Sequence, residues 1–142
     1  MLNVDHLSKT FNPGTVNEKL ALDDVCLHLA PGDFATVIGG NGAGKSTLLN
    51  CVAGVYRQNQ GNIRVNGMVL DRLPELKRAR HLGRVFQDPL MGTAADMEIE
   101  ENLALALRRG KRRTLAWGVT PQERERYHGM LKSLGLGLED RM

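Results

Sequence analysis

The sequence predicts an α/β fold, a core of strands and helices with an antiparallel β arm, followed by the start of a helical region. A short apolar run, Phe34–Ile38, leads directly into a glycine-rich loop, and apolar residues then recur at helical spacing from Ser46 to Ala53. The pair Asn66-Gly67 separates two further short apolar runs and predicts a hairpin. We therefore expect a core with its arm over residues 1–93 and the start of a helical subdomain over 94–142.

Each expected element has its own signal. Runs of strand-forming residues bounded by turn residues predict strands at Leu2–Phe11 and Leu20–Leu29. Phe34–Ile38 is β-branched and apolar, which predicts a strand buried on both faces, and Leu82–Phe86 predicts another short strand. Helical patterns cover 72–80, 99–107 and 121–134.

The last of these helices has the strongest start signal. Thr120 is a good N-cap, Pro121 suits the first helical position, and Glu123 completes a capping box. An apolar face of Tyr127, Met130, Leu131 and Leu134 follows.

Composition limits the classes of protein that are possible. The chain has 142 residues, 42% of them hydrophobic and 25% charged, which is ordinary for a soluble globular domain. It has no apolar run long enough to span a membrane and no signal-peptide pattern at its start, so we expect it to fold in the cytosol. Its two cysteines, Cys26 and Cys51, are expected to be small buried residues and not a disulfide.

The charge is unevenly distributed. Residues 1–103 carry ten Lys/Arg and twelve Asp/Glu, a net charge of −2, whereas residues 104–142 carry nine and four, a net charge of +5. The overall excess of +3 is too small to indicate nucleic acid by itself. The asymmetry instead suggests two regions with different roles.

A phosphate-binding loop carries the chemistry. Residues 39–47 match the pattern G-x-x-x-x-G-K-[ST] in full, so the predicted α/β core is a P-loop NTPase core. The expected nucleotide-binding residues are Gly39, Gly40, Asn41, Gly42, Ala43, Gly44, Lys45, Ser46 and Thr47. Glycines let this phosphate loop curl so that its backbone N–H groups can point at phosphate oxygens, and the following helix adds the positive end of its dipole.

Three side chains have expected roles towards ATP and Mg²⁺. Lys45 supplies a positive charge for the β- and γ-phosphates, Ser46 places its hydroxyl on Mg²⁺, and Thr47 can bond the α-phosphate. The alternatives are a flexible glycine turn and a dinucleotide fold. The flanking strand and helix patterns argue against the first, and the glycines do not fit G-x-G-x-x-G, whose third position falls on Lys45.

Several ordered motifs resemble the ATP-binding subunits of ABC transporters. They are Ala21–Val25, Pro31-Gly32-Asp33, the phosphate loop, Gly61-Asn62-Ile63 with Asn66-Gly67, Val85–Pro89, and Glu101-Asn102-Leu103. The stretch 88–118, with Met91-Gly92-Thr93 and Trp117-Gly118, is most similar to bacterial importers of amino acids, aromatic ones in particular. The resemblance covers essentially the whole chain.

The resemblance implies further site residues. Phe11 stands where the family places an aromatic ring against adenine, and this is the favoured role; the alternative is a core residue at a strand end. Gln87 matches the Q-loop glutamine, which reaches Mg²⁺ and the attacking water. Lys45 and Gln87 are the expected catalytic residues. Asp88 and the four histidines are expected to be solvated or structural.

The resemblance also implies partners and a place in the cell. Two copies of such subunits sandwich two ATP molecules, permease subunits contact the cleft around the Q-loop, and an importer works with a solute-binding protein. The subunit then lies at the cytoplasmic face of the plasma membrane, with no nucleic acid partner. The family's signature, Walker B strand, D-loop and switch histidine do not follow, so the chain resembles the N-terminal part of such a subunit, and ATP turnover by these 142 residues alone is not expected.

Other functions stay open at this stage. One alternative is a P-loop ATPase acting on DNA or ribosomes, and another is a module that binds nucleotide without turnover. The basic run Arg108–Arg113 is expected to be a solvated loop, with contact to a permease, to lipid headgroups or to nucleic acid as its alternatives.

Overall fold

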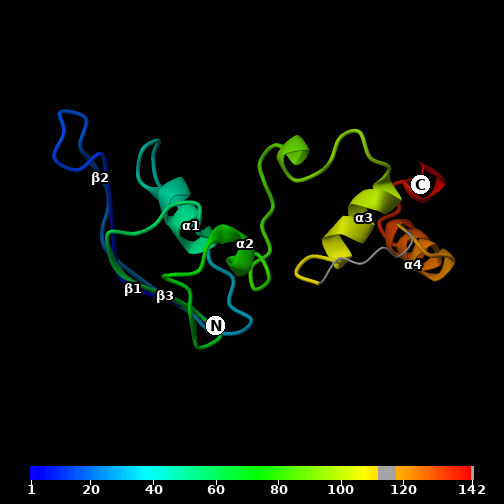
Figure 1. The fold of residues 1–142 in the computed structure, drawn as a ribbon, viewed down its shortest axis with the longest axis horizontal. Helices are drawn as coiled ribbons and strands as arrows, with labels where there is room; N and C mark the ends of the chain where they lie inside the picture. Colours follow the sequence, from blue (N-terminus) through cyan, green and yellow to red (C-terminus); the bar gives the residue numbers. More distant parts are fainter. Residues whose placement is uncertain (112–117, 142) are drawn as a thin grey trace. The chain divides into compact units, whose positions relative to one another are not determined.

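The computed structural model describes residues 1–111 and 118–141. The chain divides into two compact units, Met1–Gly83 and Arg84–Met142. Figure 1 follows the first unit from blue to green and the second from green to red. The domain boundary that we expect at residue 93 falls inside the second unit, and it stays a prediction.

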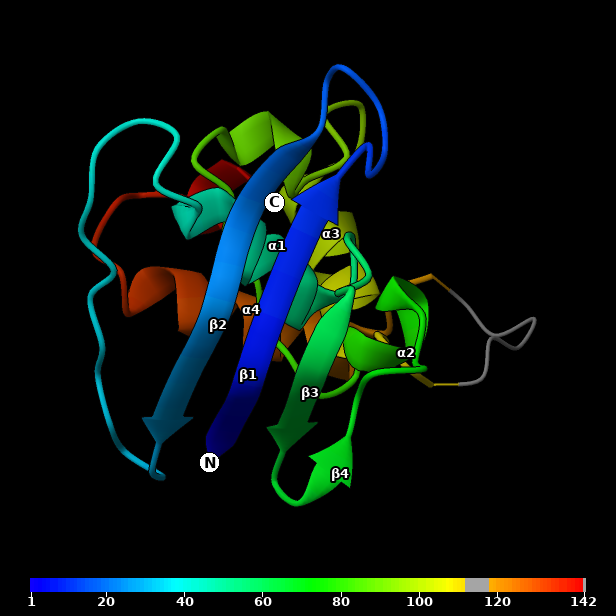
Figure 2. The same ribbon diagram turned by 90° about the vertical axis from the view of Figure 1, so that its left-hand side faces the viewer.

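The first unit is built on an antiparallel sheet with the strand order β2-β1-β3-β4. The strands are β1 (Leu2–Phe11), β2 (Lys19–Leu29), β3 (Gln60–Val65) and β4 (Met68–Val69). In Figure 2 the strands lie side by side in this order with helix α1 (Lys45–Ala53) across one face. The predicted antiparallel arm is therefore confirmed.

The predicted hairpin is also present, and its turn has the expected chemistry. Val65 pairs with Met68, so that only Asn66 and Gly67 lie between the two strands. Both turn residues have positive φ, 49° and 81°, as a two-residue turn that matches the twist of the strands requires. The side chain of Asn66 also accepts a hydrogen bond from the amino terminus of Met1, at 3.0 Å.

The core of the first unit lies between the sheet and α1. The helix contributes Leu48 and Cys51. The sheet and its connections contribute Val4, Leu7, Leu22, Ile63, Val65 and Leu70. Burial raises the pKa of the Cys51 thiol, so this cysteine is a small apolar residue, as expected. The same expectation is wrong for Cys26, which is exposed and accepts a hydrogen bond from the His6 N–H at 3.3 Å.

Two predicted strands do not form. Residues 34–38 are an extended segment without strand pairing, and Phe34 and Ile38 are 94% and 88% exposed. Residues 82–86 are likewise unpaired, with Val85 exposed. A strand needs a neighbour for its N–H and C=O groups. Within residues 1–111 and 118–141 no strand lies beside either segment, so apolar composition alone does not make them part of a sheet.

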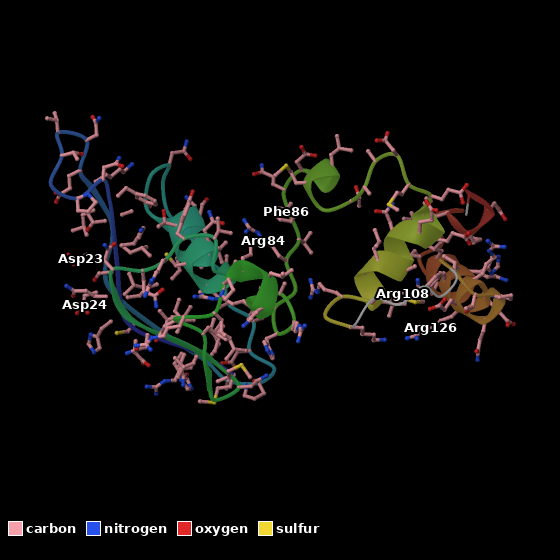
Figure 3. The ribbon with its side chains drawn as sticks, in the orientation of Figure 1. Asp23, Asp24, Arg84, Phe86, Arg108 and Arg126 are labelled. Carbon is pink, nitrogen blue, oxygen red and sulfur yellow. The ribbon has the colours of Figure 1, made fainter. Side chains whose placement is uncertain are left out.

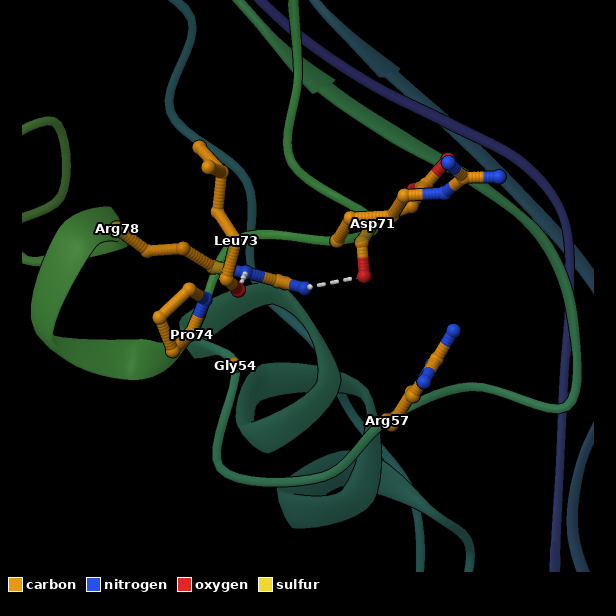
Figure 4. A pocket seen from close by; sticks show the side chains of 7 residues that line it. Gly54, Arg57, Asp71, Leu73, Pro74 and Arg78 are labelled. Atoms are coloured by element: carbon orange, nitrogen blue, oxygen red, sulfur yellow. Dashed lines mark hydrogen bonds between the residues drawn. The ribbon is translucent and has the colours of Figure 1, made fainter.

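A buried arginine holds the far end of α1. Of the predicted 72–80 helix only α2 (Glu75–Arg78) is helical, and Arg78 at its end is only 2% exposed. Its guanidinium donates to the carbonyls of Cys51 (2.7 Å), Val52 (3.1 Å) and Leu73 (2.8 Å). Figure 4 draws Arg78 beside Leu73. The bond to Val52 satisfies a carbonyl group that the end of α1 leaves without a backbone partner, whereas the Cys51 carbonyl also accepts from the Gly54 N–H at 3.2 Å. Burial lowers the pKa of Arg78, yet the group stays protonated.

The second unit contains two paired helices, α3 (Ile99–Leu107) and α4 (Pro121–Lys132), with 3₁₀ turns at Pro89–Met91 and Glu139–Arg141. The capping box predicted at Thr120 is confirmed, because its hydroxyl accepts from the Glu123 N–H and the Glu123 carboxylate accepts from the Thr120 N–H. Of the expected apolar face of α4, Tyr127 and Leu131 are buried, whereas Met130 and Leu134 are largely exposed.

Ion pairs join the two helices of this unit. Arg124 on α4 makes two hydrogen bonds of 2.6 Å to the carboxylate of Glu100 on α3, which is 5% exposed. Arg108, just after α3, donates to both carboxylate oxygens of Glu123 at 3.0 and 2.8 Å. The bonds from Arg124 lower the pKa of Glu100 and keep it ionised. The unit is thus held by charge pairing as well as by apolar contact.

We predict that Arg78→Met destabilises the chain by about 2–4 kcal/mol, because the partly buried carbonyl oxygens of Val52 and Leu73 lose the guanidinium donor and that of Cys51 loses one of its two donors. Urea unfolding followed by circular dichroism measures this difference. Lys77→Met, which removes an exposed charge from the same short helix, should change the free energy of unfolding by less than about 0.5 kcal/mol. Equal stabilities of the two variants would contradict the capping role of Arg78.

We also predict a pH-dependent contribution from Glu100. Its folded pKa is lower than its unfolded value of about 4.3, so the pair stabilises the folded state above that value and is lost as the pH falls through the folded pKa. Glu100→Gln should therefore be less stable than the wild type at pH 7, and the difference should shrink at acidic pH. Glu125→Gln, on the exposed side of α4, is the control. A difference that stays constant with pH would contradict this.

Candidate functional site

The phosphate loop forms an exposed connection that ends at the first turn of α1. Residues 39–43 are exposed, and the N–H of Ala43 donates to the Gly40 carbonyl at 3.3 Å, which closes a tight turn. The helix begins with the bond from Leu48 N–H to Gly44 O, at 2.8 Å. The expected sequence of loop and helix is therefore present, although the segment before it is not paired as a strand.

Gly44 seats this loop against the sheet. Its φ is +83°, a left-handed conformation, and a Cβ at this position would lie 2.5 Å from the carbonyl oxygen of Ala21 and 3.0 Å from the Leu22 side chain. Any side chain would collide with the backbone of β2 as well as strain its own. The motif therefore needs glycine here for close packing on β2.

The start of α1 is left free to bind an anion. No side chain caps this end, and the first turn contains no acidic residue. The first N–H groups of a helix have no partners within the helix, and they lie at the positive end of its dipole. Ser46 is exposed and Thr47 is half-buried on this first turn. Such a terminus is suited to a phosphate group.

Lys45 adds the charge that the loop needs. Its ammonium donates to the carbonyls of Gly39 and Gly40, at 2.6 and 2.7 Å, and so lies across the curve of the loop. These are weak neutral acceptors compared with a phosphate oxygen, because hydrogen bonds between two charged groups are shorter and stronger. The ammonium thus lies against the backbone of the loop, where it can exchange these acceptors for a stronger anionic one.

Phe11 lies at the end of β1 in a contact with two other side chains. Its ring meets that of Tyr56 edge to face, with centroids 5.1 Å apart and planes at 86°. The Lys9 ammonium lies 5.1 Å from the centroid of the Phe11 ring. Neither neighbour was predicted from the sequence. Lys9 could have been found from its same-face spacing to Phe11, whereas the contact with Tyr56 depends on the packing of the chain beyond α1.

The strand register brings Phe11 near the phosphate loop. Lys9 pairs with Leu22, and Phe11 pairs with Lys19 on β2. Gly44 approaches β2 at Ala21 and Leu22, so Phe11 is two or three residues further along the arm, about 7–10 Å at the usual rise of a strand. The aromatic ring and the phosphate loop therefore belong to one region of the first unit.

Gln87 lies in the other unit, so the structure does not relate it to the phosphate loop. It is exposed, in the segment after Phe86, whose ring lies 4.5 Å from the Arg84 guanidinium carbon (Figure 3). Its expected role stays a prediction. Asp23 and Asp24 follow a short apolar run in the sequence, as metal-binding acids at the end of a buried strand do. They are exposed on β2, and Asp24 pairs with His6 at 2.7 Å (Figure 3 labels both acids).

Residues 1–111 and 118–141 contain no group of three or more His, Cys, Asp or Glu side chains arranged to hold a metal ion. Among the same residues, no helix has the length and apolar character needed to cross a bilayer. Within the basic run, Arg108 is paired with Glu123, while Arg112 and Arg113, like Trp117, lie outside the described residues.

Comparison with known proteins decides the family. The family model for ABC transporters matches residues 22–142. The chain belongs to the ABC transporter family. The resemblance seen in its motifs is therefore confirmed, and so is the expected cassette fold.

Similar proteins include ATP-binding subunits of bacterial transporters. A tyrosine transport ATP-binding protein of Clostridioides difficile is 41% identical over 116 residues, which cover 78% of this chain and 44% of that protein. The ABC transporter ATP-binding protein YxdL of Bacillus subtilis is 36% identical over 141 residues, covering 96% and 51%. A methionine import ATP-binding protein of Sodalis glossinidius is 37% identical over 110 residues, covering 75% and 31%.

Solved structures agree in fold. A dimeric bacterial ABC transporter cassette superposes with a TM-score of 0.75 at 26% identity, covering 96% of this chain and 58% of that one. A nucleotide-free ATP-binding cassette gives a TM-score of 0.73 at 26% identity, covering 99% and 56%. The ABC chain described here spans about half the length of the curated relatives it matches.

We predict that Gly44→Ala destabilises the chain by about 2–4 kcal/mol, because the added methyl group strains the backbone and meets the Ala21 carbonyl. Urea unfolding measures the difference. Gly40→Ala is the matched control within the same loop: its Cβ has nothing within 4 Å and its φ is not positive, so we expect a change below about 0.5 kcal/mol. If both substitutions are equally tolerated, the close seat on β2 is not required.

Proposed function

We propose that this chain is the ATP-binding part of an ABC importer subunit, which couples the binding and hydrolysis of ATP to solute transport. The observation that carries the proposal is the geometry of the phosphate loop. Gly44 is packed on β2, the start of α1 has no capping side chain, and the Lys45 ammonium lies across the loop. Together these supply N–H donors and a positive charge to one anionic group.

Different residues of the first unit would contact different parts of the nucleotide. The N–H groups of residues 39–47 bind phosphate oxygens, and Lys45 neutralises charge on the β- and γ-phosphates. Mg²⁺, when bound, supplies further charge neutralisation of the phosphates; the Ser46 hydroxyl and the Gln87 carboxamide are oxygen donors of the kind it prefers. Phe11, with Tyr56 against its ring, offers a flat aromatic face for the base.

The transport role rests on the similar proteins. Relatives named for tyrosine transport and methionine import suggest an importer of amino acids. A dimeric cassette among the similar structures suggests that two copies of the complete subunit act together. The proposed assembly therefore joins two such subunits to permease subunits at the cytoplasmic face of the membrane, with a solute-binding protein on the other side and Gln87 near the permease contact.

Lys45→Ala tests the nucleotide site. It removes a charge-assisted contact worth about 1.5–3 kcal/mol, so we expect the affinity for ATP to fall roughly tenfold or more. Isothermal titration calorimetry with ATP and Mg²⁺ measures this on samples whose circular dichroism spectra match. Lys77→Ala removes the same charge from α2 and should bind as the wild type does. An unchanged affinity in Lys45→Ala would mean that the loop does not bind triphosphate.

A further inference from the structure

A pocket lies in the first unit at the other end of α1 from the phosphate loop. It has a volume of about 340 Å³ and is lined by Gly54, Arg57, Asp71, Arg72, Leu73, Pro74 and Arg78 (Figure 4). Gly54 directly follows α1, whereas Lys45 begins it, so the helix of nine residues separates the two places by about 13 Å. The proposed nucleotide site therefore does not use this pocket.

The pocket carries an excess of positive charge. Three arginines face one carboxylate, and that carboxylate is already engaged, since one oxygen of Asp71 accepts from the Gln58 side chain at 2.9 Å and from the Ile63 N–H at 2.7 Å. The guanidinium of Arg78 donates to backbone carbonyls and does not pair with this carboxylate. In the part of the chain that the structure describes, no carboxylate pairs with Arg57 or Arg72, and both are exposed.

The walls select the kind of anion. Leu73 and Pro74 give the pocket an apolar side next to the guanidinium groups, and Figure 4 shows Arg57 pointing towards Asp71 across the opening. A group with a short apolar stem and one negative charge fits such walls. A phosphate carries up to two negative charges and no apolar stem, so the Asp71 carboxylate repels it more strongly than a single carboxylate, and Leu73 and Pro74 gain no contact with it. The volume is also larger than a bare phosphate needs.

We propose that this pocket is a docking site for an acidic side chain, glutamate or aspartate, on a segment of a partner protein. Arg57 and Arg72 pair with its carboxylate, since guanidinium groups bind carboxylates with two parallel hydrogen bonds. Leu73 and Pro74 pack against its methylene groups. Buried Arg78 keeps the pocket in shape by fixing the end of α1 to the segment that carries Asp71, Leu73 and Pro74.

The test is a binding measurement on the full chain. The probe is a fluorescein-labelled octapeptide with one central glutamate among alanines and leucines, followed by fluorescence anisotropy at low salt; an otherwise identical glutamine peptide is compared with it. We expect the glutamate peptide to bind at least about tenfold more tightly, and the difference to shrink as the salt concentration rises.

Variants connect binding to the pocket. Arg57→Gln/Arg72→Gln should weaken binding of the glutamate peptide about tenfold or more, whereas Lys77→Gln/Arg80→Gln, which removes the same net charge from exposed neighbouring positions, should change it less than about threefold. Both double variants should keep the affinity for ATP, so failure here is distinguishable from failure of the nucleotide site.

Three outcomes would overturn the proposal. They are equal binding of the glutamate and glutamine peptides, no binding of either at millimolar concentration, and equal effects of the two double variants. Competition by inorganic phosphate at concentrations below those at which free glutamate competes would show a phosphate site instead. Binding only to vesicles of anionic lipid would show a membrane contact.

Discussion

The close contact between Gly44 and the backbone of β2 determines where α1 lies, and most of the first unit depends on the position of that helix. Because Gly44 has no side chain, the helix starts directly against the sheet and can bury Leu48 and Cys51 on it. The same contact fixes the phosphate loop relative to the end of β1. A structural constraint on packing and a functional constraint on binding therefore fall on one glycine.

The two ends of α1 are treated in opposite ways. At its start, N–H groups are left without side-chain caps, which creates a place for a negative charge. At its end, the carbonyls of Cys51 and Val52 are bound by the buried guanidinium of Arg78. The helix thus presents its positive pole to a ligand while its negative pole is neutralised within the fold.

The second unit depends more on charge pairing than the first. Its two helices bury few apolar side chains, chiefly Ala104, Tyr127 and Leu131. Arg124 with Glu100 adds a doubly hydrogen-bonded ion pair, and Asn102 holds the segment before α3 through bonds to both backbone groups of Ala94. Asn102 belongs to a motif that the sequence resemblance identified, and its observed role is to order this entry to the helix.

The sequence by itself determined the features whose cause is local. The phosphate loop, the turn at Asn66-Gly67 and the cap at Thr120 follow from the conformations and hydrogen bonds that a few adjacent residues allow, and the fold and family follow from their order. Only the tertiary structure decided which apolar segments are paired. Phe34–Ile38 has the composition of a buried strand but remains unpaired, because pairing requires a neighbour that composition does not reveal.

The same limit applies to the charged and aromatic residues. The burial of Arg78 could not be predicted, since a helix of four residues gives no reason for one of its cations to face inward. Its acceptors on α1, the carbonyls of Cys51 and Val52, are 27 and 26 residues away in sequence. The contact of Phe11 with Tyr56 likewise joins distant parts of the chain. Local chemistry is encoded by neighbours in sequence, whereas burial and pairing depend on residues that only folding brings together.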